Sequence, residues 1–137
     1  MTEVVNIEKA TEEVTAWLDR KKIPMSRRVD SQSIIDNLIE AVQYGYISIS
    51  EDGKIKQTLQ FPLEDSQKVV FLSELQYNNR SNTDAVLKIV GSMRVQTAES
   101  NILARIAELT NQPMGYVMKF DSVDMIIAKS IGVFFTS

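Results

Sequence analysis

The chain has 137 residues, a net charge of −3 and 44% hydrophobic residues, without cysteine or histidine. This length is usual for one domain with a single core. The missing residue types exclude disulfides, thiolate chemistry, Cys/His zinc sites and histidine-based acid–base catalysis. No apolar run approaches the roughly 18 residues of a membrane helix, and the first residues lack a signal-peptide pattern. These absences are typical of the cytoplasm of a cell or of a host.

Two amphipathic helices are expected in the N-terminal part, over 6–21 and 31–44. Asn6 can cap the first, whose apolar face comprises Ile7, Ala10, Val14, Trp17 and Leu18. Pro24 is expected to prevent helix between the two. The second has Ser31 or Ser33 as its cap, Gly45 as its C-terminal stop, and an apolar stripe of Ile34, Ile35, Leu38, Ile39 and Val42.

A β-hairpin is expected around Glu51-Asp52-Gly53. A two-residue Asp52-Gly53 loop would set Ile49 opposite Lys56, so the apolar faces of the strands would disagree. A three-residue loop with Gly53 in the left-handed conformation sets Ile49 opposite Ile55, and we therefore prefer it. Pro62 is expected to end the second strand.

Residues 64–77 allow two interpretations, because the run Val69-Val70-Phe71-Leu72 suits a buried strand or a helix. Acidic residues at its start and its length favour a helix. Further helices are expected at 83–93, at 97–109 and from Asp121 or Ser122 onward, the last with Val123, Ile126, Ile127, Ile131 and Phe134 at helical spacing. The predicted class is α+β, mainly α, with about six helices around one small β-hairpin. Residues 1–137 form a single domain, in which 1–45 could be a helical extension to a core of 46–137.

A basic cluster, Arg20-Lys21-Lys22 and Arg27-Arg28, lies between the first two helices. A helix-turn-helix would place such residues against phosphates, but its turn has only about three or four residues. The link here is longer and contains Pro24, so a solvated surface patch is the favoured interpretation. Nucleic-acid binding is not the expected role.

Two carboxylate pairs could in principle serve a metal ion or acid–base catalysis: Asp121 with Asp124, and Glu64 with Asp65. Helix capping explains both pairs without chemistry. The chain shows no phosphate loop, dinucleotide fingerprint or nucleophile elbow. We therefore expect no catalytic residues, no metal, no cofactor and no enzymatic activity.

Because no catalytic or metal-binding residues are expected, the function is expected to come from a surface that binds other proteins. Met114 and Met118 flank Gly115-Tyr116-Val117, and methionine suits adaptable contacts as well as cores. Phe134 and Phe135 are adjacent, so only one of them can point straight into a core from a helix. An exposed phenylalanine there would mark an interaction site.

The second half of the chain, roughly residues 50–137, resembles the tail assembly chaperones of tailed bacteriophages. A turn and strand over 52–62 lead into helical segments, followed by Ile102-Leu103-Ala104-Arg105-Ile106-Ala107-Glu108-Leu109-Thr110 and, after a loop, Phe120-Asp121-Ser122-Val123-Asp124-Met125. A short apolar helix with Phe134-Phe135 closes this pattern. Residues 1–45 match no part of it.

The resemblance implies a non-catalytic protein that binds the long tape-measure protein, keeps it soluble and helps to recruit the tail-tube protein. The expected contact residues are Ile127, Ile131, Phe134 and Phe135, followed by Met114, Tyr116 and Met118. Self-association into a homo-oligomer is possible, and no membrane contact is expected. The alternatives are a structural virion component, such as a ring-forming connector or tail-terminator subunit, and after it a small DNA-binding regulator.

Overall fold

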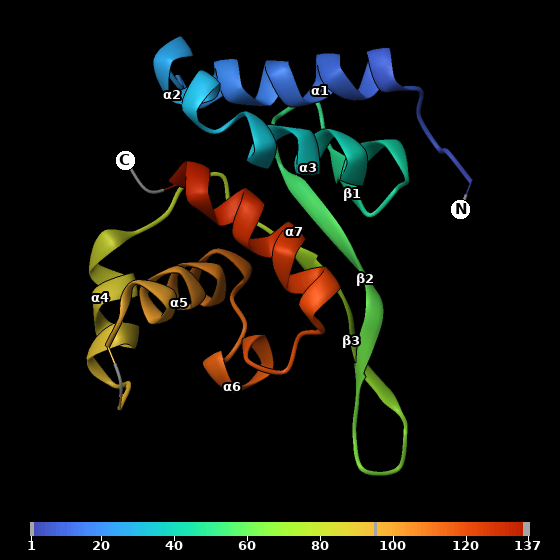
Figure 1. Ribbon diagram of the computed structural model, residues 1–137. Coiled ribbons are helices and arrows are strands. Elements are labelled where there is room, and N and C mark those ends of the chain that lie inside the picture. The colour runs from blue at the N-terminus through green and yellow to red at the C-terminus, as the bar shows by residue number, and fades with distance from the viewer. Residues whose placement is uncertain (1, 95, 136–137) are drawn as a thin grey trace.

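A computed structural model describes residues 2–94 and 96–135 of the chain (Figure 1). This part contains seven α-helices, one short 3-10 helix and one three-stranded antiparallel sheet, which confirms the α+β, mainly α class. The elements in chain order are α1 (Ile7–Arg20), α2 (Met25–Asp30), α3 (Gln32–Gln43), β1 (Ile47–Ile49), β2 (Ile55–Glu64), β3 (Val70–Gln76), α4 (Thr83–Gly91), α5 (Ala98–Thr110), α6 (Met114–Val117), α7 (Ser122–Gly132) and η1 (Val133–Phe135).

The start of α1 and the end of α3 follow their sequence signals, whereas Ser31 stands at the start of α3 without a capping hydrogen bond from its side chain. Asn6 caps α1 by accepting a hydrogen bond of 2.8 Å from the backbone N–H of Lys9. Gly45, at φ +79°, ends α3 in the left-handed conformation, and the N–H of Tyr46 then reaches the carbonyl of Ala41 at 2.8 Å. Both predictions are confirmed.

Helix α2 corrects the expectation that Pro24 prevents helix between the first two helices. Helix α1 ends at Arg20, where Lys22 adopts the left-handed conformation and the N–H of Ile23 reaches the carbonyl of Leu18 at 3.1 Å. Pro24 instead starts α2, and its carbonyl accepts hydrogen bonds from the N–H groups of Arg27 and Arg28. A proline at the start of a helix loses no intrahelical hydrogen bond, since the first N–H groups have no partner there.

The β1–β2 hairpin has the predicted register, with Ile49 opposite Ile55. Glu51, Asp52 and Gly53 form the loop between Ser50 and Lys54, and the N–H of Ser50 donates to the carbonyl of Lys54 at 2.9 Å. Gly53 adopts φ +85°, the left-handed conformation that this loop requires.

Two expectations for the following segment were wrong. Residues 70–76 form strand β3 rather than a helix, because they pair antiparallel with β2 and point Leu75 into the core. Pro62 does not end β2, which continues to Glu64. The register of β2 against β3 shifts between Thr58 and Leu63, and Pro62 lies in this irregular stretch. A proline is tolerated there because no regular ladder needs its N–H.

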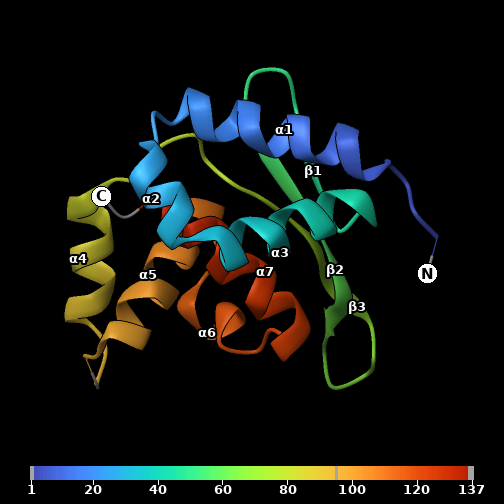
Figure 2. The same cartoon turned by 45° about the horizontal axis from the view of Figure 1, so that its top comes forward.

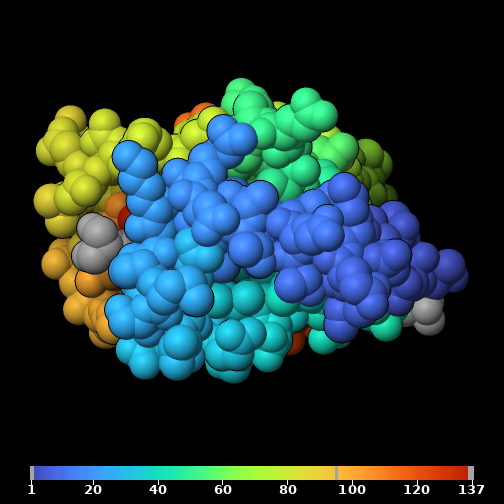
Figure 3. All heavy atoms as spheres, turned by 90° about the horizontal axis from the view of Figure 1, so that it is seen from above, coloured from blue at the N-terminus to red at the C-terminus, as the bar shows by residue number. Residues whose placement is uncertain are grey.

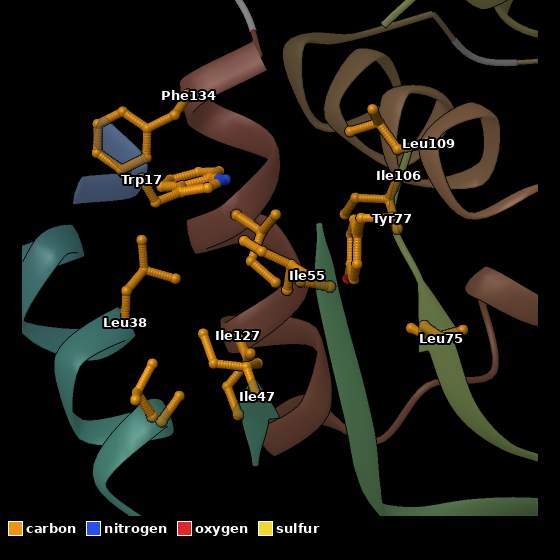
Figure 4. Close-up of a cluster of buried hydrophobic side chains, with 14 of the residues drawn as sticks. Trp17, Leu38, Ile47, Ile55, Leu75, Tyr77, Ile106, Leu109, Ile127 and Phe134 are labelled. Atoms are coloured by element: carbon orange, nitrogen blue, oxygen red, sulfur yellow. The ribbon is translucent and has the colours of Figure 1, made fainter. Parts of the chain in front are cut away.

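One hydrophobic core joins the N-terminal helices to the rest of the molecule. Helix α7 passes through the middle, between α3 on one side and the sheet with α5 on the other (Figures 1 and 4). Trp17 of α1 packs edge-on against Phe134, with ring centroids 5.9 Å apart. The helices α1 and α3, predicted as a possible extension, thus contribute Val14, Trp17, Leu18, Leu38 and Val42 to the same core as Ile106, Ile127 and Ile131.

A chain of buried polar groups connects the sheet to α7. The hydroxyl of Tyr77 donates to the side-chain oxygen of Gln57 at 2.6 Å, and the amide of Gln57 donates to the backbone carbonyl of Asp124 at 3.0 Å. The Asp124 carboxylate, itself fully buried, accepts hydrogen bonds from the N–H groups of Gln60 and Phe61 at 2.8 and 3.0 Å. These bonds fix the irregular part of β2 against the first turn of α7.

Candidate protein-binding surface

The far half of β2 and β3 extends from the helices as a two-stranded ribbon (Figures 1 and 2). The ribbon and the neighbouring helix α6 carry six exposed large apolar side chains, here called the ribbon surface. Its members and their exposed fractions are Phe61 (54%), Val69 (56%), Val70 (48%), Phe71 (42%), Tyr116 (37%) and Met118 (64%). Single exposed apolar residues are common, but several on one projecting element indicate an interaction site.

An aromatic contact joins the ribbon to α6. The rings of Phe71 on β3 and Tyr116 on α6 lie with centroids 5.0 Å apart, inclined at 56°. Residues 71 and 116 come from elements that are distant in sequence, so the surface exists only in the folded protein. Val117 is fully buried beneath α6 and anchors this short helix to the core, while Met114 is half-buried against it.

The turn at the end of the ribbon is held by Asp65. Its carboxylate accepts hydrogen bonds from the N–H groups of Gln67 and Val69, at 2.8 and 3.0 Å. Its backbone N–H donates to the carbonyl of Val69 at 3.0 Å. The pair Glu64-Asp65 therefore includes a turn-forming residue, and Val69 is presented by a defined loop.

The other carboxylate pair also has a structural role. Asp121 caps α7 by accepting a hydrogen bond from the N–H of Val123 at 3.0 Å. Asp124 holds β2, as described above. Among residues 2–94 and 96–135, no three or more acidic, histidine or cysteine residues are placed to hold a metal ion. In the same described part, no helix is both long and apolar enough to cross a membrane.

Three of the contact residues predicted from sequence lie in the core. Ile127, Ile131 and Phe134 are buried, because α7 and η1 are covered on several sides by α1, α3, α5 and the sheet. Their side chains do not form an accessible surface, which corrects that part of the prediction. Helical spacing identifies an apolar stripe, but it cannot distinguish a stripe covered by the chain itself from one left for a partner.

Phe135 is half-buried rather than freely exposed. Its ring centroid lies 6.1 Å from that of Trp17, and the ammonium nitrogen of Lys21 lies 3.3 Å from its centroid. Tyr116 and Met118 are exposed and belong to the ribbon surface, while Met114 lies partly beneath it. Of the seven predicted contact residues, these two are the ones that the structure places on an open apolar surface.

Sequence reasoning missed the four ribbon residues: Phe61, Val69, Val70 and Phe71. The sequence pattern predicts a buried strand or a helix for Val69, Val70 and Phe71, and it gives Phe61 no role beyond the apolar row of a hairpin strand. One available signal was the polar stretch from Glu64 to Lys68, which separates two apolar runs of similar length, as in a hairpin. Even with that signal, the sequence would not have shown that the outer part of the hairpin extends past the helices.

Comparison of the chain with protein-family models, with curated proteins and with solved structures finds no match. Function is therefore inferred from the geometry of the ribbon surface and from the sequence features.

Proposed function

We propose that this protein is a non-catalytic assembly factor of the tail-chaperone type, which binds an apolar segment of a tape-measure protein through the ribbon surface. One observation carries the proposal: a projecting ribbon that leaves large apolar side chains exposed and packs the ring of Phe71 against that of Tyr116. Aromatic and methionine side chains are enriched at binding surfaces, since they offer large contact areas that adapt to a partner.

The shape of the surface favours an elongated polypeptide partner. A narrow two-stranded ribbon presents apolar residues along its length, and an amphipathic helix of a long coiled-coil protein offers an apolar stripe of similar form. Burial of the exposed apolar area of Phe71 and Tyr116, whose rings are in contact, would provide roughly 25 cal/mol per Å² of driving force. Many copies of this protein, each making one such weak contact, would together keep a long partner soluble.

The test is co-expression with the longest predicted coiled-coil protein encoded near this chain, followed by affinity capture and determination of the mass of the complex. The double variant Phe71→Ser with Tyr116→Ser should reduce capture by at least about tenfold, because it removes the aromatic pair that joins the ribbon to α6. Leu87→Ser is the matched control, since Leu87 is also a large exposed apolar residue but lies on α4, away from the ribbon. This control should bind as the unmodified protein does.

Two outcomes would contradict the proposal. Capture that is unaffected by the double variant would place the partner on another surface. Absence of any capture by the folded, unmodified protein would remove the tape-measure protein as its partner.

The projecting ribbon also favours a second candidate, a structural virion component. An arm that reaches beyond its own domain can pack on a neighbouring copy, and repeated head-to-tail contacts of this kind close into rings. In that case the protein alone would form a discrete ring in light-scattering measurements, and Phe71→Ser with Tyr116→Ser would dissociate it. A monomeric protein that captures the coiled-coil partner would favour the chaperone instead.

A further inference from the structure

A polar pocket of about 350 Å³ lies at the C-terminal end of α1, on the opposite side of the molecule from the ribbon tip. Three segments enclose it: the end of α1, the β1–β2 loop and the stretch that follows β3. These segments meet on the face shown in Figure 3. The pocket is lined by Trp17, Arg20, Lys21, Lys22, Asp52, Gly53, Asn79 and Arg80.

The lining carries four cationic side chains and one carboxylate. Arg20 donates from its guanidinium to the backbone carbonyl of Glu51 at 2.5 Å, which fixes it beside the β1–β2 loop. Lys21, Lys22 and Arg80 form no ion pair and no side-chain hydrogen bond with any residue in the described part of the chain. The positive charges of Lys21 and Arg80 lie close enough to repel each other, and within the described residues neither forms an ion pair.

Lys21 shows the electrostatic consequence of this arrangement. Burial, and after it the nearby guanidinium groups of Arg80 and Arg27, lowers the pKa of Lys21 from 10.5 to about 8. Its ammonium group lies over the ring of Phe135 and 5.6 Å from the ring centroid of Trp17. Aromatic rings stabilise a cation only partly, so an anion in the pocket would relieve the remaining repulsion.

The helix dipole explains some of this basic cluster but not all of it. Cations are favoured at a helix C-terminus, which accounts for Arg20, Lys21 and Lys22. Arg80 follows β3, about sixty positions later in the chain, and the fold brings it to the same pocket. The helix dipole does not account for Arg80, which comes from a second segment, has no ion pair among the described residues and lowers the pKa of Lys21.

We infer that this pocket binds a small multivalent anion of the phosphate class through the side chains of Lys21, Lys22 and Arg80. Three unpaired cationic side chains in the lining of one cavity suit a doubly or triply charged ligand better than a single carboxylate. Guanidinium and ammonium groups are the usual partners of phosphate oxygens. This inference is independent of the ribbon surface and of the function proposed for it.

The surroundings favour a compact ligand over an extended nucleic acid. Asp19, Glu51 and Asp52 lie on or beside the same segments, and a polyanion running out of the pocket would meet their negative charge. Asp52 accepts a hydrogen bond from the hydroxyl of Ser50, which lowers the pKa of the Asp52 carboxyl and keeps it ionised. The net charge of −3 also opposes binding of a long polyanion.

The test is a titration of the ¹⁵N-labelled protein with inorganic pyrophosphate at neutral pH in chloride buffer, followed by amide chemical shifts. We expect saturable shifts confined to residues 20–22, 52–53 and 79–80, with a Kd below about 1 mM. Arg80→Gln and Lys22→Gln should each weaken binding at least about fivefold, because each removes one charge that contacts the anion. Asp52→Asn should strengthen binding, since it removes the negative charge from the lining.

Arg94→Gln is the matched control, because it removes an exposed charge of the same type outside the pocket and should leave Kd unchanged. The dispersion of each amide spectrum shows whether a variant has folded. Linear shifts without saturation would overturn the inference, as would equal weakening by Arg94→Gln and Arg80→Gln. Salt-dependent binding of a single-stranded oligonucleotide, with pyrophosphate failing to saturate, would overturn it in favour of a nucleic-acid surface.

Discussion

The carboxylate of Asp124, in the first turn of α7, accepts a hydrogen bond of 2.8 Å from the backbone N–H of Gln60 in β2. The same carboxylate also accepts from the N–H of Phe61. Both N–H groups lie in the stretch of β2 where its pairing with β3 is irregular, so they need an acceptor from outside the sheet. Asp124 therefore sets the position from which the ribbon extends.

Replacement of Asp124 tests this role directly. Asp124→Asn keeps the shape of the side chain but turns one of its two acceptor oxygens into a donor, which would face an N–H group. We expect the free energy of unfolding to fall by about 1–3 kcal/mol, measured by urea denaturation. Asp121→Asn should change it by less than about 0.5 kcal/mol, because asparagine caps helices as well as aspartate does. Similar losses for the two variants would contradict this assignment.

Gly53 is required for two separate reasons. Its φ of +85° is unfavourable for other residues, and a Cβ atom there would lie 2.8 Å from Nε of Arg20. Gly53→Ala should therefore lower the free energy of unfolding by more than the roughly 1 kcal/mol expected from backbone strain alone.

Adding Arg20→Ala to Gly53→Ala should recover the steric part of the loss and leave the backbone part. Gly91→Ala serves as the control, since a Cβ atom at that helical position would meet nothing within 4 Å. It should be neutral or slightly stabilising. Failure of Arg20→Ala to recover any stability would show that the contact with Arg20 is not what excludes a side chain at position 53.

Phe134 and Phe135 should respond differently to truncation. Phe134 is buried against Trp17, so Phe134→Ala should cost about 3–5 kcal/mol of unfolding free energy. Phe135 is half-buried beside Trp17 and Lys21, so Phe135→Ala should cost only about 1–2 kcal/mol. Thermal or chemical denaturation measures both, and a larger loss at Phe135 would reverse this order.

Stability should pass through a maximum at alkaline pH. The pKa of Lys21 is lowered to about 8 in the folded protein from 10.5, so the unfolded chain binds more protons between these values and stability rises with pH. Tyr77 acts in the opposite direction, because burial and the Asp124 carboxylate raise its pKa well above 10.0. The unfolded chain loses that proton near pH 10.0, so stability then falls as pH rises further.

Denaturation midpoints between pH 7 and 11 would separate the two effects. Lys21→Met should remove the rise above pH 8, since methionine has no proton to lose at that position. Tyr77→Phe should remove part of the fall above pH 10.0, although it also leaves the side-chain oxygen of Gln57 without its donor. A pH profile that Lys21→Met does not change would show that Lys21 keeps an ordinary pKa.

Local signals in the sequence predicted much of the fold. Asn6, Gly45, Thr97 and Asp121 each stand next to a helical apolar pattern, and the structure places each at a helix end. The register of Ile49 against Ile55 followed from the need to keep apolar residues on one face. These features depend on neighbouring residues only, so sequence contains the information that determines them.

Strand β3 and the candidate surface depend on contacts between distant residues. Val69-Val70-Phe71-Leu72 is too short a run to separate strand from helix by periodicity, and pairing with β2 decides it. The buried state of Ile131 follows from its central place among other helices, while the exposure of Phe71 follows from the extension of the ribbon past them. Neither feature can be seen from the spacing of apolar residues.

The packing of Trp17 against Phe134 has a consequence for synthesis of the protein. Helices α1 and α3 lie close in sequence and can associate early, since their contacts need only a short loop. The ring of Trp17, however, is covered on one side by a residue that the ribosome adds more than one hundred positions later. In a nascent chain one side of this tryptophan ring therefore stays uncovered until η1 has emerged, which makes the ring a fluorescent reporter for the moment when the core closes.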